Sequence, residues 1–185
     1  MKVLVTGVKG QLGYDVVNEL TKRGIEAVGV DIQDMDITDA ASVEKVIGEV
    51  APDAVIHCAA YTAVDAAEDN VELCRRVNAD GTQNIANVCK KLDCKMIYIS
   101  TDYVFDGEGT RAWEPDDERH PLNIYGQTKY EGELAVQNFI KTMLNLGKTH
   151  DHLTVVNDQF GSPTYTYDLA RLLVDMVLTD KYGIY

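Results

Sequence analysis

Three glycines near the start of the chain constrain its fold more than any other feature. Gly7, Gly10 and Gly13 form a GxxGxxG pattern that follows a β-branched run, Lys2 to Thr6, and precedes a helical pattern, Gln11 to Arg23. Between a strand and a helix, such glycines permit a tight turn and close backbone approach, and the helix N-terminus offers N–H groups to a pyrophosphate. The pattern therefore predicts a dinucleotide-binding turn. Glycines that only form a tight turn between strand and helix are the alternative.

Short apolar segments that favour strands alternate with helical patterns along the rest of the chain. The expected strands are Lys2 to Thr6, Glu26 to Val30, Ala54 to His57 and Met96 to Ile99. No hairpin signals separate them, so the sequence predicts an α/β fold, a Rossmann-like doubly wound parallel sheet. In such a sheet, ligands gather outside the carboxyl ends of the strands. The residues expected at that edge are Gly7, Asp31, Ala59 and Thr101.

Asp31, at the end of the second expected strand, bears on the choice of cofactor. A carboxylate there is placed to accept from a ribose 2′-OH and to repel a 2′-phosphate, which favours NAD(H) over NADP(H). Lys9, inside the glycine loop, could attract a phosphate, so use of both cofactors stays open. Asp36 is either a turn residue or a ligand to the adenine amino group.

Small and polar residues follow the third expected strand. Ala59 and Ala60 would let a flat cofactor pass close to the backbone, or would serve helix–sheet packing. Asn78 lies in a mostly buried helical pattern, Val71 to Leu92, and needs hydrogen-bond partners. We expect it to bridge the backbone of neighbouring strands, with indirect support of the active site.

Tyr125 and Lys129 are four residues apart and would share one helix face. A fixed ammonium beside a phenol favours the phenolate and lowers the pKa of the phenol, which makes Tyr125 a proton donor to a carbonyl oxygen. A hydroxyl from Ser100 or Thr101 could orient that oxygen and stabilise its developing charge. The alternative is an amphipathic helix with an exposed lysine and a half-buried tyrosine.

Charge and cysteine usage exclude several classes of protein. A formal net charge of −13 disfavours nucleic acid as a partner. Four cysteines show no metal-ligand spacing and no secretory leader precedes them, so we expect reduced thiols, a cytoplasmic protein and no metal site. The longest apolar runs are too short to span a bilayer, which disfavours a membrane partner.

Five sequence strings, taken together, resemble a known family. They are the glycine loop at 7–13, HCAAYTAVDAAE at 57–68, STDYVFDG at 100–107, PLNIYGQTK at 121–129 and DQFGSPTYTYDLA at 158–170. With Asp31, they resemble the extended short-chain dehydrogenase/reductases and, within them, the dTDP-4-dehydrorhamnose reductases. The resemblance covers essentially the full chain. It implies reduction of the C4 ketone of a dTDP-linked 6-deoxyhexulose by a nicotinamide cofactor.

The resemblance also implies roles for individual residues. Thr101 would be the catalytic hydroxyl, Tyr125 the general acid, and Lys129 the cation that lowers the Tyr125 pKa and holds the nicotinamide ribose. The implied cofactor-binding residues are Gly7, Gly10, Gln11, Leu12, Gly13, Asp31, Asp36, Ile37, Ala59, Ala60, Tyr61, Tyr125 and Lys129. The implied substrate-binding residues are Asp102, Tyr103, Asp158, Gln159, Pro163 and Thr164. For Asp102 a turn role is an equal alternative, and the loop at 158–164 could be an ordinary Gly-Ser-Pro loop.

The chain departs from the family in two places. In the family a strand follows the Tyr/Lys helix, whereas here GELAVQ runs directly into NFIKTMLNLGK, and the family continues beyond the terminal KYGIY. Either the protein is naturally shortened at these places, or it has further residues there. Because loss of a sheet strand would expose the core, we expect further residues. The expected organisation is an NAD(P)-binding Rossmann domain at 1–137 and a partial substrate-binding region, interleaved with the sheet, at 138–185.

Two other functions stay open. The chain could also form a homodimer. Another nucleotide-sugar reductase or epimerase of the extended group would keep Thr101, Tyr125 and Lys129. The fold also resembles the methionine adenosyltransferase β-subunit, which would imply a regulatory subunit without catalysis. The complete Thr/Tyr/Lys set favours an enzyme.

Overall fold

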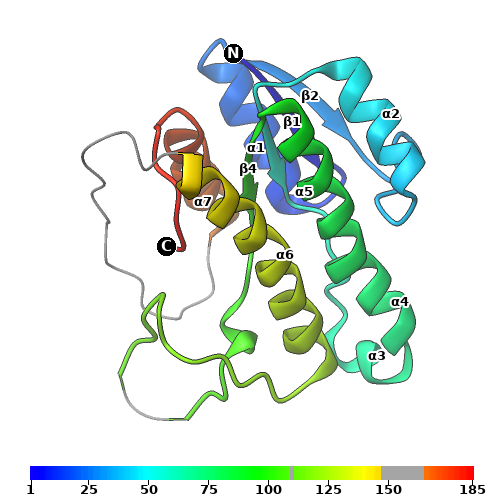
Figure 1. The fold of residues 1–185 in the computed structure, drawn as a ribbon, viewed down its shortest axis with the longest axis vertical. Coiled ribbons are helices and arrows are strands. Elements are labelled where there is room, and N and C mark those ends of the chain that lie inside the picture. The colour runs from blue at the N-terminus through cyan, green and yellow to red at the C-terminus, as the bar shows by residue number, and fades with distance from the viewer. Residues whose placement is uncertain (109–110, 147–164) are drawn as a thin grey trace.

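The structure is a computed structural model that describes residues 1–108, 111–146 and 165–185, with side chains described for all of these except residues 138–146. Figure 1 shows the arrangement of its elements. In chain order they are β1 Lys2–Thr6, α1 Gln11–Lys22, β2 Glu26–Val30, α2 Ala40–Val50, β3 Ala54–His57, α3 Val64–Asp69, α4 Val71–Arg75, a π-helical turn η1 Arg76–Asp80, α5 Gly81–Leu92, β4 Lys95–Tyr98, a 3-10 turn η2 Asp102–Val104, α6 Ile124–Leu146 and α7 Thr166–Val177.

The described strands form one parallel sheet in the order β2-β1-β3-β4. The register pairs Lys2 with Glu26, Val3 with Ala54, and Ala54 with Lys95. This confirms the predicted doubly wound parallel sheet. β4 begins and ends one residue earlier than predicted, because the Lys95 N–H already donates to the Asp53 carbonyl at 3.1 Å.

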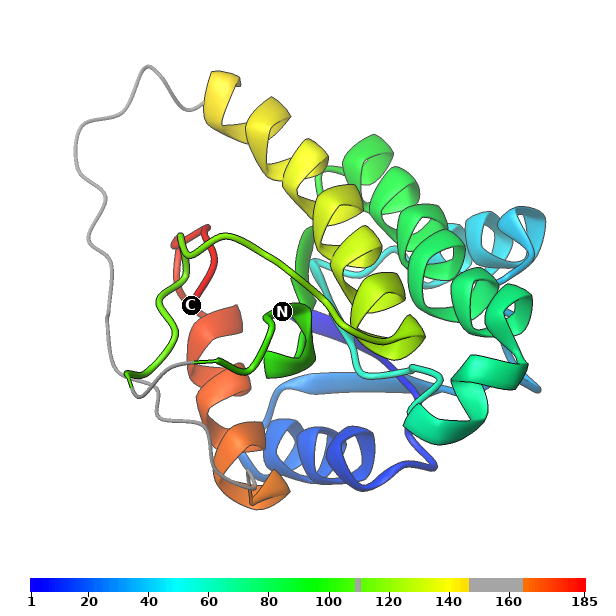
Figure 2. The same ribbon diagram turned by 90° about the horizontal axis from the view of Figure 1, so that it is seen from below.

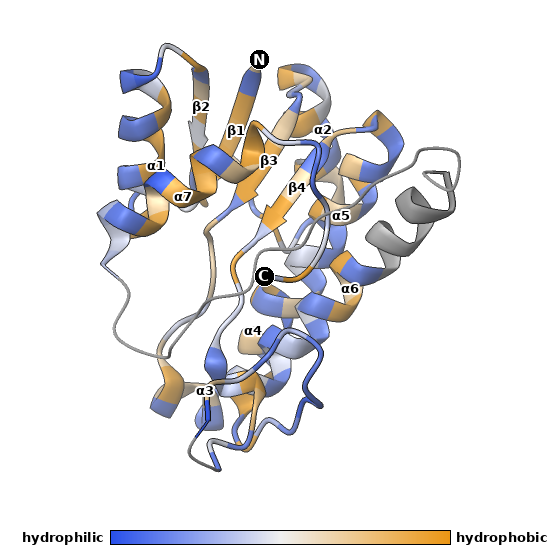
Figure 3. Ribbon diagram, turned by 90° about the vertical axis from the view of Figure 1, so that its left-hand side faces the viewer, coloured by the Kyte–Doolittle hydropathy of each residue, from blue (hydrophilic) through white to orange (hydrophobic). Residues whose placement is uncertain are grey.

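Helices cover both faces of the sheet, as Figure 2 shows, with α1 and α7 on one face and α5 and α6 on the other. Alternate strand residues point to opposite faces. Val3 and Val5 pack with Leu173 of α7 in one core cluster, whereas Leu4 packs with Ile47 of α2 in the other. The apolar strands in Figure 3 lie between these helices. Both faces of the sheet are therefore buried, as the continuous apolar runs of a parallel sheet require.

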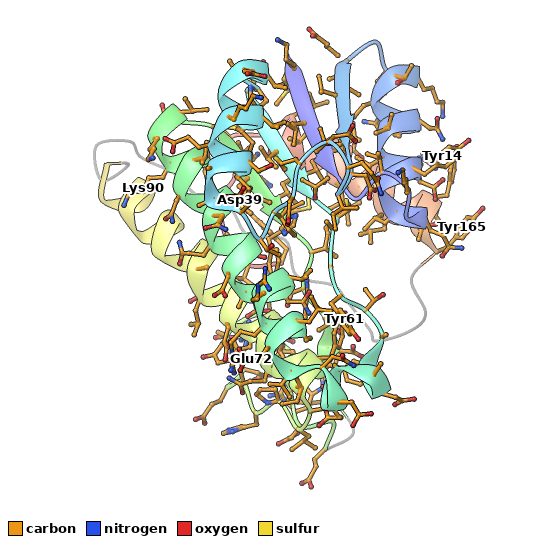
Figure 4. The ribbon with its side chains drawn as sticks, turned by 90° about the vertical axis from the view of Figure 1, so that its right-hand side faces the viewer. Tyr14, Asp39, Tyr61, Glu72, Lys90 and Tyr165 are labelled. Carbon is orange, nitrogen blue, oxygen red and sulfur yellow. The ribbon has the colours of Figure 1, made fainter. Side chains whose placement is uncertain are left out.

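Local signals explain where several elements begin and end. The Asp39 carboxylate accepts from the Ala41 N–H at 3.0 Å and caps α2, and Figure 4 shows Asp39 at the start of that helix. The helix predicted over Val71 to Leu92 is present, but its centre is the π-helical turn η1. That turn contains Asn78, and π-turns are frequent at functional sites.

The last two described helices are the long helix α6 and the helix α7, which packs on α1. α6 runs without interruption from Ile124 to Leu146. α7 packs on α1, where the Thr166 hydroxyl donates to Asp15 at 2.6 Å and Arg23 forms an ion pair with Asp175. Among the described residues, no helix is both long and apolar enough to cross a membrane.

Candidate active site

A cavity of about 700 Å³ lies at the carboxyl ends of the strands. This volume suits a small-molecule or cofactor site. It brings together residues from the glycine loop, the end of β2, the end of β3 and the helix α6. Twelve of the predicted cofactor-binding residues line it: Gly7, Gly10, Gln11, Leu12, Gly13, Asp31, Asp36, Ile37, Ala59, Ala60, Tyr125 and Lys129.

The glycine loop forms a concave backbone surface in which side chains at Gly7 or Gly13 would clash with neighbouring atoms. Gly7 has a φ of +69°, and a Cβ there would lie 2.8 Å from the Cα of Ala59. A Cβ on Gly13 would lie 2.3 Å from the Gly7 carbonyl oxygen. The start of α1 also has no side-chain cap, so its first N–H groups are free to meet an anion. The backbone of this loop therefore fits the pyrophosphate of a dinucleotide.

Asp31 sits at the end of β2 and is held in place by backbone donors. Its carboxylate accepts from the Lys9 N–H at 3.0 Å and from the Ile32 N–H at 2.9 Å. The Lys9 ammonium donates to the Gln33 side chain, so it lies at the same end of the cavity. A carboxylate and an ammonium thus lie together at this end of the cavity.

Asp36 lines the cavity and also makes a local turn. Its carboxylate accepts from the N–H of Thr38 at 2.9 Å and from the Thr38 hydroxyl at 2.8 Å. Both bonds go to one carboxylate oxygen, Oδ1, so the turn role of Asp36 is present in the structure, and its role toward an adenine amino group stays a prediction.

A buried chain of hydrogen bonds underlies the alanines that follow β3. The Thr6 hydroxyl oxygen accepts from the N–H groups of Cys58 and Ala59, both at 3.1 Å, so its own hydrogen is directed to His57 Nδ1 at 2.7 Å. The Thr82 hydroxyl donates to the Asn78 carbonyl and lies 3.2 Å from His57 Nε2. These partners assign one neutral tautomer to His57. Burial, with a smaller effect of the Lys129 charge, lowers the pKa of His57 to about 3.

Tyr61 was also predicted to bind the cofactor, and this stays a prediction. It lies in the connection between β3 and α3 (Figure 4) and does not line the cavity. Its N–H donates to the Asn78 side chain at 2.8 Å, and its carbonyl accepts from the same amide at 3.1 Å. The Asn78 amide also reaches the Thr128 hydroxyl at 3.2 Å. Asn78 therefore bridges this connection to α6, not two strands.

Tyr125 and Thr101 meet where β4 ends and α6 begins. A Thr101 side-chain hydrogen bond lowers the Tyr125 pKa, but burial has the larger effect and raises it. The Tyr103 ring packs edge-on to the Tyr125 ring, with centroids 5.7 Å apart. Gly126 makes this approach possible, since a Cβ there would lie 2.1 Å from the Tyr103 carbonyl oxygen.

Lys129 is buried and does not act on Tyr125 as predicted. Its ammonium donates to the Ile99 carbonyl at 2.6 Å and lies 4.1 Å from the centroid of the Tyr98 ring. Burial lowers the pKa of Lys129 to about 8. The Tyr125 pKa is raised, the opposite of the expected direction, because desolvation of the phenol outweighs its hydrogen bond.

The predicted substrate-binding residues divide into two groups. Asp102 and Tyr103 lie in η2, directly after Thr101, and the Thr101 hydroxyl donates to Asp102 at 3.1 Å. Asp158, Gln159, Pro163 and Thr164 lie outside the described residues.

Several cavity residues were missed by the sequence reasoning. They are Thr6, Val30, Ile32, Met35, Thr38, His57, Cys58, Thr62, Val77, Ile99 and Thr166. Thr6, His57, Cys58 and Ile99 could have been found, because each lies at or just beyond the carboxyl end of a predicted strand. Thr166 could not, since it belongs to α7 and reaches the cavity only through the packing of α7 on α1.

Comparison with known proteins identifies one family. The model described as the RmlD substrate binding domain matches residues 1–138 and 137–185. The chain is 36% identical to a spore coat polysaccharide biosynthesis protein of Bacillus subtilis over 204 residues, and 36% identical to a dTDP-4-dehydrorhamnose reductase of Aggregatibacter actinomycetemcomitans over 211 residues. Each alignment covers 100% of this chain and 72% of the relative.

A solved structure agrees with the sequence relatives. The dTDP-4-dehydrorhamnose reductase of Bacillus anthracis, solved in complex with NADP, superposes with a TM-score of 0.85 at 37% identity. The match covers 100% of this chain and 74% of that one.

The two stretches matched by the family model meet at residues 137–138. A chain of 185 residues is also covered in full by an alignment of 211 positions, so the relative has residues with no counterpart here. The meeting point of the two stretches coincides with the place where the sequence departs from the family pattern.

Proposed function

The chain belongs to the family described as the RmlD substrate binding domain, and from this we propose that it is an NAD(P)-dependent oxidoreductase of dTDP-rhamnose biosynthesis. The reaction is reduction of the C4 ketone of dTDP-4-dehydro-L-rhamnose to dTDP-L-rhamnose. One observation supports this most strongly: Tyr125 and Lys129 line the same cavity as the glycine loop and Asp31. A nicotinamide cofactor bound along this cavity would place its nicotinamide end beside Tyr125 and Lys129. Its adenosine end would lie beside the glycine loop and Asp31.

The residues at the reactive end suit reduction of a carbonyl group. A bound nicotinamide supplies the hydride. Tyr125 keeps its proton at neutral pH, because burial raises the pKa of its phenol, and it donates that proton to the ketone oxygen. The Thr101 hydroxyl, which donates to Asp102 in this structure, would turn to the same oxygen and stabilise its developing negative charge. The Lys129 ammonium supplies positive charge beneath this site and a donor for the nicotinamide ribose.

The adenosine end supports NAD(H) as the favoured cofactor, with NADP(H) also used. The Asp31 carboxylate is fixed by two backbone donors and would accept from a ribose 2′-OH. Lys9 lies beside it and would offset part of the repulsion of a 2′-phosphate. The NADP complex of the Bacillus anthracis relative is in keeping with use of the phosphorylated cofactor.

The substrate sugar is proposed to lie beside η2, where Asp102 and Tyr103 flank Tyr125. The remaining substrate contacts are assigned to Asp158, Gln159, Pro163 and Thr164. In the same way, we propose residues 1–137 as the NAD(P)-binding domain and 138–185 as part of a substrate-binding region. The protein then binds a dTDP-sugar rather than nucleic acid or a membrane. We also propose that two copies of the chain form a homodimer.

A cytoplasmic location is part of the proposal. It is supported by the four cysteines, which are all free thiols, and three of which are buried. Proteins of oxidising compartments commonly pair such residues.

An absorbance assay tests the proposed reaction. The purified full-length protein is mixed with dTDP-4-dehydro-L-rhamnose and with NADH or NADPH, and oxidation of the nicotinamide is followed. We expect turnover with both cofactors and loss of turnover in Tyr125→Phe. No oxidation with either cofactor would refute the reductase. Cofactor binding without turnover would favour a regulatory subunit, and turnover of a different nucleotide sugar would favour another enzyme of the extended group.

A further inference from the structure

A buried carboxylate lies one helical turn beyond Lys129, and the proposed reaction leaves it without a role. Glu133 is 8% exposed. One carboxylate oxygen accepts from the Ser100 hydroxyl, and the other accepts from Arg119 Nε at 3.3 Å. Ser100 is the residue directly before Thr101, so Glu133 is linked to the strand end that presents the proposed catalytic hydroxyl.

Arg119 brings a second segment to Glu133. Its guanidinium donates to the Pro115 carbonyl at 2.8 Å and lies 5.0 Å from the centroid of the Phe105 ring, which stacks on Trp113. Both side chains of the Arg119–Glu133 pair are nearly inaccessible to solvent, at 8% and 9% exposed. The segment that follows η2 is therefore anchored to α6 by one buried ion pair.

Glu133 is also the carboxylate that acts on Lys129. The Lys129 ammonium has no direct carboxylate partner among the described residues. It faces groups from β3, β4, α4 and α6, which are His57, Cys58, Tyr98, Cys74, Tyr125 and Glu133. His57 is neutral, and burial raises the pKa of the Cys58 thiol to about 12, so that thiol is neutral too. Burial also raises the pKa of the Tyr98 phenol.

The negative charge of Glu133 therefore has the main compensating effect on Lys129. Desolvation lowers the Lys129 pKa, and Glu133 is the strongest of the groups that raise it. Without this carboxylate, a larger fraction of Lys129 would be neutral near physiological pH.

We propose that Glu133 is a positioning residue of the reaction, which compensates the Lys129 ammonium charge and, through Ser100 and Arg119, fixes both sides of the reactive end against α6. The inference rests on the proposed reductase function. A purely structural ion pair is the competing interpretation, since breaking one member of a buried pair destabilises a protein without any link to catalysis.

The pH dependence of turnover distinguishes the two interpretations. Glu133→Gln should move the alkaline limb of the kcat profile to lower pH by about one unit, because a nearby opposite charge shifts a pKa by that order. Arg119→Gln should move the limb to higher pH, because Glu133 then acts on Lys129 without its own counter-ion. A structural role would lower the amplitude of both profiles and leave the position of the limb unchanged, and that result would overturn the inference.

Glu131→Gln is the matched control. Glu131 lies on the same helix and pairs with Arg75 at 2.9 Å, outside the cavity. Its substitution should leave the limb in place. If Glu133→Gln does not fold, the double variant Glu133→Gln/Arg119→Gln removes both buried charges and should still shift the limb to lower pH.

A direct titration of Lys129 separates this inference from the proposed function. The Nζ resonance of ¹⁵N-labelled lysine is followed against pH in the wild-type chain and in Glu133→Gln, and Lys129→Met identifies the signal. We expect the Lys129 midpoint to fall by about one unit in the variant. If the wild type shows no reductase activity, the proposed function fails, whereas an unchanged midpoint overturns the inference in either case.

Discussion

The two ends of the cavity are built in different ways. At the adenosine end, the glycine loop and the start of α1 offer backbone N–H groups, and the geometry depends on the absence of side chains at Gly7 and Gly13. At the reactive end, the geometry depends on side chains that are held by partners distant in the sequence. Lys129 reaches the Ile99 carbonyl, and Asn78 joins Tyr61 to Thr128.

This difference determines how each end responds to change. A backbone cradle fails when a new atom occupies its space, so substitutions there act through sterics and stability. A side-chain network fails when a charge or a donor is lost, so substitutions there act through pKa values and orientation.

The largest effect is expected at the proposed proton donor. Tyr125→Phe removes the phenol and should lower kcat by about 10²- to 10⁴-fold with little change in cofactor affinity. Lys129→Met should reduce both kcat and cofactor affinity, because the ammonium would contact the nicotinamide ribose. Steady-state kinetics and cofactor fluorescence titrations measure the two quantities. Equal and small losses in both variants would instead show that the two residues have no catalytic role.

The next effect is expected in the glycine loop. Gly13→Ala places a Cβ against the Gly7 carbonyl, so it should destabilise the fold by about 1–3 kcal/mol and weaken binding of NADH and NADPH alike. Gly48→Ala, in the helix α2, is the control, because a Cβ there meets open space, and it should stabilise the fold slightly. Chemical denaturation and cofactor titration test the pair. Unchanged cofactor affinity in Gly13→Ala would contradict a backbone cradle.

His57 should make stability depend on pH. Its folded-state pKa of about 3 lies below its usual value, so the neutral form is favoured in the fold. Stability is then fully present above pH 6.5 and is lost as the pH falls toward 3, by about 1.4 kcal/mol per unit. The difference in free energy of unfolding between wild type and His57→Gln should shrink accordingly. His120→Gln, at an exposed histidine, serves as the control, and a difference independent of pH would refute the buried neutral tautomer.

The smallest effect is expected in cofactor preference. Asp31→Asn removes the charge that repels a 2′-phosphate and should shift the ratio of kcat/KM for NADPH over NADH upward by about five- to tenfold. Lys9→Ala should shift the same ratio downward by less, because this ammonium is exposed. Both ratios come from the absorbance assay. A shift of the Asp31 variant toward NADH would contradict the role of that carboxylate.

Much of the fold could be predicted because it depends on local patterns. The glycine loop, the strands β1, β2 and β3 and the cap of α2 each depend on residues within one short segment. The parallel order of the sheet follows from their alternation with helices. The position of β4 was wrong by one residue, because its limits depend on the ladder with β3.

In the candidate site, too, some features depend on local sequence and others depend on contacts between distant segments. The sequence by itself determined which residue types stand at the carboxyl edge of the sheet, including Asp31, Thr101 and the Tyr125/Lys129 pair, since their spacing is a property of the chain. Only the tertiary structure decided that Asn78 fastens Tyr61 away from the cavity, that Glu133 compensates Lys129, and that the Tyr125 pKa rises. The physical reason is that burial and charge depend on every segment packed around a group, and the segments packed on α6 come from six other elements, α3, α4, η1, α5, β4 and η2.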